Sequence, residues 1–197
     1  MTDPIPGGAP PAAPNRSKRP LRFALRCIRD LVIAAALVHL VTAFFLQPVR
    51  VEGDSMQPGI RDAERIFINK FSYRFGDVHR GDVVVFTPPS DAGKTCIKRV
   101  VGLPGETIRI SDGAVFIDGK RLHEPYIVPA TRSEGDIDGF TIPGGNYFVL
   151  GDHRDFSNDS RNWGPIPGDQ ILGKAVLRYW PPSAFGLIGG AAAPKSP

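Results

Sequence analysis

The sequence predicts a mainly β protein: an antiparallel, partly barrel-like β domain that follows one N-terminal transmembrane helix. Three observations support this fold class. The 197 residues include 20 Pro and 22 Gly, which is typical of a chain with many turns. After residue 50, no long stretch repeats its apolar residues with the 3.6-residue period of a helix. Before that point, residues 31–46 form one uncharged apolar stretch.

The first 20 residues are predicted to be a disordered cytoplasmic tail. Residues up to about Asn15 are rich in Pro, Gly and Ala, and they bury too little apolar surface to offset the entropy of the chain. Residues 1–30 carry six basic and two acidic side chains, a net charge of +4, and the remaining 18 basic and 18 acidic side chains cancel. The body therefore has no basic excess for a nucleic-acid face, and we expect no nucleic-acid partner.

Residues 21–47 are predicted to be an uncleaved membrane anchor. The stretch from Leu31 to Leu46 has no formal charge and ends just before Pro48. At ~1.5 Å per residue it covers about 24 Å of a hydrocarbon core that is ~30 Å thick, and basic side chains before it can extend its reach. Because the positive cluster precedes the stretch, we expect the N-terminus in the cytoplasm and the rest of the chain on the outer face.

A cleaved signal peptide is the alternative for this stretch, since Val41-Thr42-Ala43 has the small residues of a cleavage site. The apolar run continues through Phe44-Phe45-Leu46, where a cleaved peptide would turn polar, and this favours the anchor. His39 lies inside the stretch and is interpreted as a packing residue of the helix, not as a proton relay.

Short β runs place the β domain at residues 48–180, long enough to hold a core. Strands are predicted at residues 65–69, 83–86, 96–101, 107–110, 114–117, 147–150 and 171–179. Ser111-Asp112-Gly113 is a hairpin signal and Asp118-Gly119 marks the next turn. Residues 130–145 are rich in Gly and are predicted to be an exposed insertion, and residues 181–197 a loosely ordered C-terminal tail.

Ser55 is the first candidate catalytic residue, in the string Gly53-Asp54-Ser55-Met56-Gln57-Pro58. Such a string is also an ordinary turn. Two features favour a functional role: Gly53 allows a substrate to approach the backbone closely, and a loop serine offers its own N–H beside its hydroxyl as an oxyanion donor. No histidine lies in an obvious triad context, so a serine enzyme here needs lysine as its base.

Lys98 is the candidate base, in the predicted strand Cys96-Ile97-Lys98-Arg99-Val100-Val101. With an ordinary pKa near 10.4, a lysine is neutral at pH 7 only about once in a few thousand molecules, so it must be desolvated to act as a base. In a strand, Cys96 and Val100 flank Lys98 on its own face, and neither pairs with its charge. On this pattern alone, a solvated lysine or one paired with a carboxylate is the ordinary alternative.

The segment from Gly151 to Arg161 packs three Asp, two Arg and two Ser into eleven residues. A metal loop is one interpretation, but the spacing of the Asp residues does not match the calcium-loop pattern and no Glu closes it. We favour a network of ion pairs and hydroxyl hydrogen bonds that holds a neighbouring strand and orients the lysine. Cys27 and Cys96 form no metal-binding pattern, so we expect no metal and no cofactor.

Taken in order, these strings resemble the type I signal peptidases, membrane-bound serine proteases that remove signal peptides from exported proteins. The matching pieces are the apolar stretch and the following strings: Gly53 to Pro58, Arg80-Gly81-Asp82-Val83-Val84, Ile97 to Gly105, and Gly151 to Arg161. The resemblance extends from about residue 31 to about residue 180.

The resemblance implies that Ser55 is the nucleophile and Lys98 the general base. It also implies that Ser157 hydrogen-bonds the lysine and that Asp159 and Arg161 form a structural ion pair. Gly53, Ser55 and Met56 would border the oxyanion and substrate approach, and the segment from Arg80 to Asp82 would be a turn.

Two positions depart from the family pattern. Many members have a serine two residues before the nucleophile, whose hydroxyl completes the oxyanion hole, whereas this chain has Gly53. A missing donor costs ~3 kcal/mol of transition-state stabilisation if nothing replaces it. Position 153, often Asn in the family, is His153, which is interpreted as a loop histidine and not as a catalytic base.

We therefore expect a serine endopeptidase that works by acyl transfer on preprotein signal peptides with small residues at P1 and P3. Its expected partners are these signal peptides and the lipid bilayer, with the secretion translocon nearby. Two alternatives stay open. One is a specialised peptidase that processes a single secreted or pilus substrate, and the other is a catalytically silent, membrane-tethered β domain that binds peptides.

Overall fold

The computed structural model describes residues 19–89, 93–127 and 136–189. It divides the chain into two units, residues 1–42 and residues 43–197. Nearly all of the predicted disordered tail, residues 1–20, lies outside the described residues.

Helix α1 spans Arg19–Phe45. The side chains of residues 23–40 are all exposed, and Phe23, Leu31 and Leu40 are each between 65 and 71% accessible. Among the described residues, no helix is both long enough and apolar enough to cross a membrane. A helix therefore covers most of the predicted anchor, and its passage through a bilayer stays a prediction.

Antiparallel strands make up the second unit. Their bounds are β1 Leu46–Arg50, β2 Arg65–Asn69, β3 Val83–Phe86, β4 Cys96–Gly102, β5 Thr107–Ser111, β6 Ala114–Ile117, β7 Lys120–Arg121, β8 Ile137–Thr141, β9 Asn146–Leu150, β10 Ile166–Pro167, β11 Ile171–Trp180 and β12 Gly186–Leu187. Short helical turns connect some of them: η1 Arg154–Phe156, α2 Ser160–Trp163, η2 Gly168–Gln170 and η3 Pro182–Ala184.

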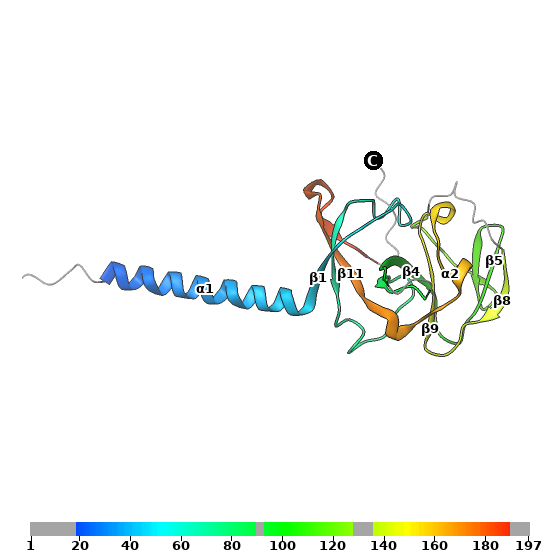
Figure 1. Cartoon of the computed structure of the whole chain (residues 1–197), viewed down its shortest axis with the longest axis horizontal. Coiled ribbons are helices and arrows are strands. Elements are labelled where there is room, and N and C mark those ends of the chain that lie inside the picture. Colours follow the sequence, from blue (N-terminus) through cyan, green and yellow to red (C-terminus); the bar gives the residue numbers. More distant parts are fainter. Residues whose placement is uncertain (1–18, 90–92, 128–135, 190–197) are drawn as a thin grey trace, which may run out of the picture. The chain divides into compact units, whose positions relative to one another are not determined.

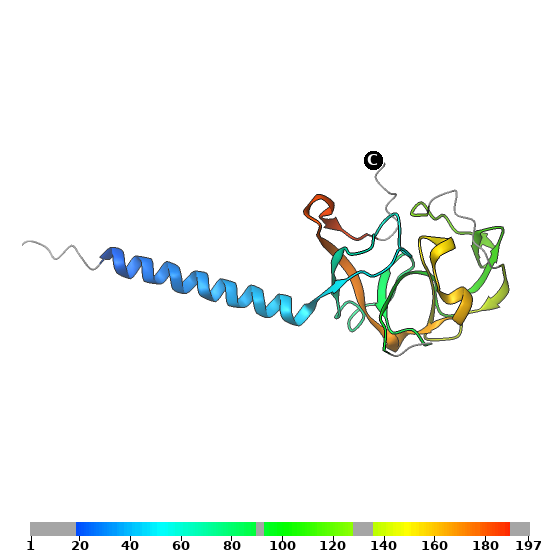
Figure 2. The same ribbon diagram turned by 45° about the horizontal axis from the view of Figure 1, so that its top comes forward.

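These strands form two sheets. The first runs in the order β1-β2-β11-β3-β4-β9-β10, with β12 beside β11, and the second runs β7-β6-β5-β8. Figures 1 and 2 show the first sheet curling on itself, with β5 and β8 at the end of the unit far from β1. The prediction of a mainly β, antiparallel fold with a partly barrel-like sheet is confirmed.

The core follows from the alternation of side chains along the strands. Strand β3 is buried throughout, and its neighbours β11 and β4 pair with it on both edges. Val83 and Val85 pack into one apolar cluster with Ile66 and Ile68 of β2, whereas Val84 and Phe86 pack into another with residues of β4 and β9. Because successive residues point to opposite faces, the unbroken apolar run of β3 fits a strand that is covered on both sides.

The second sheet has its own core, in which Ile108 and Ile110 of β5 meet Phe148 and Leu150 of β9. This core includes a strand that was not predicted. Residues 137–141, placed by the sequence in an exposed insertion, form β8 and pair with β5. Ile137 and Phe140 pack against the cluster. Residues 130–135 of the same predicted insertion lie outside the described residues.

The chain beyond Trp180 also has structure that was not predicted. Residues 182–184 form the turn η3, and β12 pairs with β11 through Leu177↔Leu187 and Arg178↔Gly186. Several apolar side chains of this hairpin are exposed to solvent. Its sequence therefore lacks the alternation of apolar and polar residues that predicts a strand.

Candidate active site

Ser55 lies on the loop that connects β1 to β2. Gly53 in this loop has a φ of +88°, a conformation that glycine adopts without strain, and its N–H donates to Asp62 Oδ1 at 2.8 Å. Met56, expected near the substrate approach, is fully buried in the cluster with Ile66 and Ile68. The Met56 side chain therefore supports the loop from inside the core and does not face solvent.

Lys98 lies on β4, directly opposite Val84 of β3. The side chains of Val84 and Val100, which share its face of the sheet, are completely buried. Lys98 itself is only 5% exposed. Val84 and Val100 thus place the amine in apolar surroundings with little access to water.

These two residues meet in the folded chain. Lys98 Nζ lies 2.6 Å from Ser55 Oγ, at hydrogen-bond distance, although 43 residues separate them in the sequence. Burial lowers the pKa of Lys98 below its ordinary value, and this effect outweighs the opposing pull of nearby negative groups such as Asp159. The geometry can therefore place a neutral amine against a serine hydroxyl, the requirement for base-assisted nucleophilic attack.

The loop that begins at Gly151 is docked directly against the Ser55 loop. The backbone N–H of His153 donates to Ser55 O at 3.0 Å, and His153 Nδ1 lies 3.2 Å from Asp54 O. Gly151 makes this approach possible, because a Cβ at that position would lie 2.6 Å from Ser55 O. The sequence did not reveal these contacts, since they join residues that are almost one hundred positions apart.

Ser157 lies in the same loop, but its hydroxyl does not make the expected hydrogen bond to Lys98. Ser157 Oγ is buried and has no hydrogen-bond partner within the described residues. Its side chain lies against Gly151, where an added Cβ would meet Ser157 Oγ at 2.2 Å. The Ser157 side chain therefore packs against Gly151, next to the loop that carries Ser55.

Asp159 and Arg161 form a two-point ion pair. Arg161 Nε donates to Asp159 Oδ1 at 2.8 Å and Arg161 Nη2 donates to Asp159 Oδ2 at 3.0 Å. Asp159 is completely buried and also accepts the N–H of Gly151 at 3.0 Å. The pair therefore fixes the start of the loop that carries His153 and Ser157.

A second buried ion pair lies next to the lysine. Arg99, the residue after Lys98, donates to both carboxylate oxygens of Asp152 at 2.8 and 2.7 Å, and its guanidinium lies 4.1 Å from the centre of the Tyr126 ring. Arg154 makes a further ion pair with Glu124. The expected network of charges in the loop is present, but the sequence did not show that Arg99 and Glu124 supply two of the partners.

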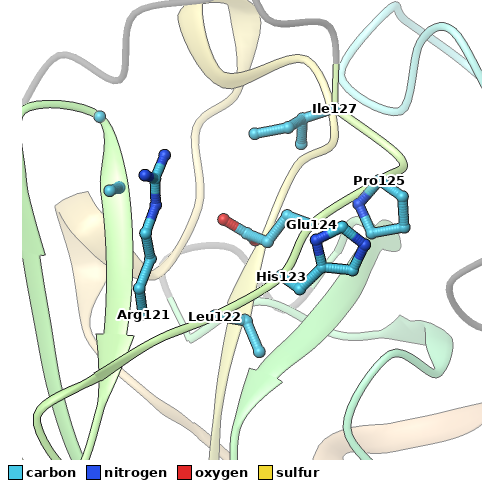
Figure 3. Close-up of a pocket in the computed structure, with 8 residues that line it drawn as sticks. Arg121, Leu122, His123, Glu124, Pro125 and Ile127 are labelled. Atoms are coloured by element: carbon cyan, nitrogen blue, oxygen red, sulfur yellow. The ribbon is translucent and has the colours of Figure 1, made fainter.

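Two cavities lie outside the dyad. One, of about 590 Å³, lies beside β7 and is lined by residues 113–114, 121–125 and 127. Figure 3 shows its labelled side chains, among them Arg121, His123 and Glu124. A larger one, of about 1160 Å³, lies between residues 58–64 and the segment 180–189. Neither Ser55 nor Lys98 lines either of these two cavities.

The sequence of this chain is similar to those of known proteins over most of its length. Residues 24–180 match the family model described as signal peptidase, peptidase S26. A probable signal peptidase I-1 of Synechocystis is 36% identical over 177 residues, which cover 86% of this chain and 89% of the relative. Signal peptidase IB of Staphylococcus aureus is 33% identical, with coverages of 82% and 92%. A crystal structure of a signal peptidase I from Enterococcus faecalis is 32% identical with a TM-score of 0.45, covering 50% of this chain and 96% of that one.

Proposed function

Because the chain belongs to the signal peptidase family, peptidase S26, and is a serine protease, we propose that it removes N-terminal signal peptides from exported preproteins with Ser55 as nucleophile and Lys98 as general base. The observation that carries this proposal is the 2.6 Å contact between Lys98 Nζ and Ser55 Oγ at an amine that is only 5% exposed. Burial penalises the charged amine and lowers the pKa of Lys98, which shifts its equilibrium toward the neutral form that accepts a proton.

The reaction is acyl transfer. Ser55 Oγ attacks the carbonyl carbon of the scissile bond while Lys98 Nζ takes the hydroxyl proton, and the negative charge that develops on the carbonyl oxygen faces the N–H of Ser55. The ammonium then gives its proton to the leaving amine, which breaks the C–N bond and leaves an acyl-enzyme. Lys98 next accepts a proton from water, the resulting hydroxide attacks the ester, and Ser55 regains its proton.

Substrate recognition is proposed to use main-chain pairing with an extended segment. Strand β1 begins the order of the first sheet and pairs only with β2 in the described part of the chain, and β9 pairs with β4 only from Arg99 onward. Main-chain groups near both members of the dyad are therefore available to an added strand. Shallow space beside such a strand suits small residues at P1 and P3 of the signal peptide.

The site of action is proposed to be the outer face of the cell membrane, near the secretion translocon. We propose that α1 anchors the chain, with the N-terminus in the cytoplasm. Support comes from the large apolar side chains that α1 exposes, such as Phe23 and Leu31, and from the basic residues that precede residues 31–46. Exposing this apolar surface to water is unfavourable, and a lipid bilayer around α1 would remove it from water.

The test is cleavage of a preprotein by the full-length chain in detergent. Ser55→Ala and Lys98→Met are each expected to abolish cleavage, while Lys120→Met, a matched change at the exposed strand β7, is expected to keep it. Retained cleavage in either dyad variant would refute the assignment. A folded wild-type chain that neither cleaves nor reacts with serine-directed acylating probes would instead favour a silent peptide-binding domain.

A further inference from the structure

We infer that His153 is a positioning residue that orients the oxyanion-binding N–H of Ser55 and so offsets the absence of a serine hydroxyl at Gly53. The inference rests on the proposed acyl transfer at Ser55. His153 touches neither the hydroxyl of Ser55 nor the amine of Lys98 in any hydrogen bond of the described residues. It acts through the backbone of the nucleophile loop.

The contact that matters is between the His153 ring and Asp54 O. His153 Nδ1 lies 3.2 Å from this oxygen, which also accepts the backbone N–H of Gln57 at 3.1 Å, so the two donors hold it together. A carbonyl oxygen only accepts hydrogen bonds, so Nδ1 must carry the proton and donate. Both the imidazolium and the Nδ1–H tautomer do so, and the contact therefore survives a change in the protonation of the other nitrogen.

Asp54 O and the Ser55 N–H belong to one peptide unit. The unit is planar and trans, so its C=O and N–H point in opposite directions. Holding the oxygen at one side of the plane fixes the direction of the N–H at the other. A donor on the oxygen also polarises the peptide, which strengthens the N–H as a donor. The Ser55 N–H donates to no acceptor within the described residues and is available to a substrate oxygen.

A second hydrogen bond makes the arrangement rigid. The backbone N–H of His153 donates to Ser55 O at 3.0 Å, so one residue holds two consecutive carbonyl groups of the nucleophile loop. The ring of His153 is itself supported by Phe156, whose ring centre lies 4.5 Å away. Two fixed carbonyls leave the Ser55 backbone little freedom to rotate, which is the preorganisation that an oxyanion donor requires.

Gly53 explains why this support is needed. It has no side chain, and its own N–H is already donated to Asp62. With no hydroxyl at that position, the donor beside the Ser55 hydroxyl is the N–H of Ser55 itself. An asparagine at position 153 can also present an N–H to Asp54 O through its side-chain amide.

The experiment compares three variants with the wild type in preprotein cleavage across a pH series: His153→Ala, His153→Asn and, as the control, His123→Ala in the loop that lines the smaller cavity. His153→Ala is expected to lower kcat about tenfold with KM within twofold, because the lost interaction matters only when charge develops on the substrate oxygen. His153→Asn should recover kcat to within about threefold of wild type, and His123→Ala should match wild type.

Two further readouts separate positioning from other roles. The midpoint of the acidic limb of kcat/KM should not move in His153→Ala, since Lys98 sets it. A peptide boronate that forms a tetrahedral adduct on Ser55 should bind the Ala variant about tenfold more weakly, in proportion to the loss in kcat/KM. The inference is overturned if His153→Ala keeps full kcat, if His153→Asn is as slow as His153→Ala, or if the pH midpoint shifts. A wild type that does not cleave would overturn the proposed function as well, whereas a cleaving wild type with an equally fast Ala variant overturns this inference alone.

Discussion

Replacing Gly151 with alanine tests how tightly the two loops of the site are packed. The new Cβ would lie 2.6 Å from Ser55 O, 2.2 Å from Ser157 Oγ and 2.5 Å from Ser157 Cβ. Ordinary contacts begin near 3.4 Å, so Ser55 O would have to move by 0.8 Å, the difference between 3.4 and 2.6 Å. Two of the three atoms belong to the Ser157 side chain, and the third is the backbone oxygen of Ser55, the proposed nucleophile.

The displacement predicts a loss of both stability and rate. Overpacking of this kind costs about 1–3 kcal/mol of unfolding free energy. A shift of ~1 Å at a reacting group costs about 100-fold in rate, so kcat for preprotein cleavage should fall by about that factor. The assay measures kcat and KM for the full-length chain in detergent, together with urea unfolding of the same preparations.

Two glycine variants serve as controls. Gly102→Ala also meets close neighbours, Ile142 Cδ1 at 2.4 Å and Phe148 Cβ at 3.1 Å, but these belong to the core of the second sheet. It should lose stability while keeping kcat within twofold. Gly144→Ala has nothing within 4 Å of the new Cβ and should change neither quantity. A folded Gly151→Ala enzyme with wild-type kcat would refute the claim that this loop positions Ser55.

Three other changes have defined outcomes. Gly53→Ser places a side chain at a φ of +88°, so urea unfolding should show a loss of about 1–2 kcal/mol and kcat should not rise; a tenfold gain in kcat would show that the added hydroxyl reaches the oxyanion. Asp152→Asn leaves the guanidinium of Arg99 buried without its charge partner, and unfolding free energy should fall by about 3–5 kcal/mol; a change below 1 kcal/mol would contradict the burial of this pair. Lys98→Met should raise the unfolding free energy at pH 7. Burial lowers the pKa of Lys98 in the folded state, so below pH 10.5 the unfolded chain binds more protons and the wild type loses stability as the pH falls. The difference between Lys98→Met and wild type should therefore shrink as the pH rises toward 10.5, and a gap that widened would contradict this sign.

Much of the β domain could be predicted because its strands follow simple local patterns. Residues 65–69, 83–86 and 114–117 form strands at the predicted bounds, and each contains a run of at least three β-branched or aromatic residues near turn signals. Strand β8 was missed because Asp138 and Gly139 interrupt its pattern and it relies on pairing with β5. Its stability comes from a tertiary contact, which local propensity does not contain.

The dyad residues could be selected from the sequence, whereas their surroundings could not. The Ser55 and Lys98 strings each have an ordinary interpretation when taken alone, and the order of all the matching strings along the chain is what selected these two residues. The pairing of Arg99 with Asp152 joins positions that are 53 residues apart, and nothing in either string specifies the partner. Ser157 packs against Gly151 and its hydroxyl has no hydrogen-bond partner among the described residues, so a resemblance between sequences could name the residue but not the contact that it makes in this structure.

The state of the Lys98 amine is the most direct test of the whole mechanism. Titration of the lysine Nζ resonances by heteronuclear NMR, with Lys98→Met to identify the signal that disappears, measures the pKa of this amine against the other lysines of the chain. Burial against Val84 and Val100 predicts that Lys98 releases its proton below the ordinary value of 10.5 and below the exposed lysines. A Lys98 amine that titrates at 10.5 or above, together with the exposed lysines, would contradict its role as the base.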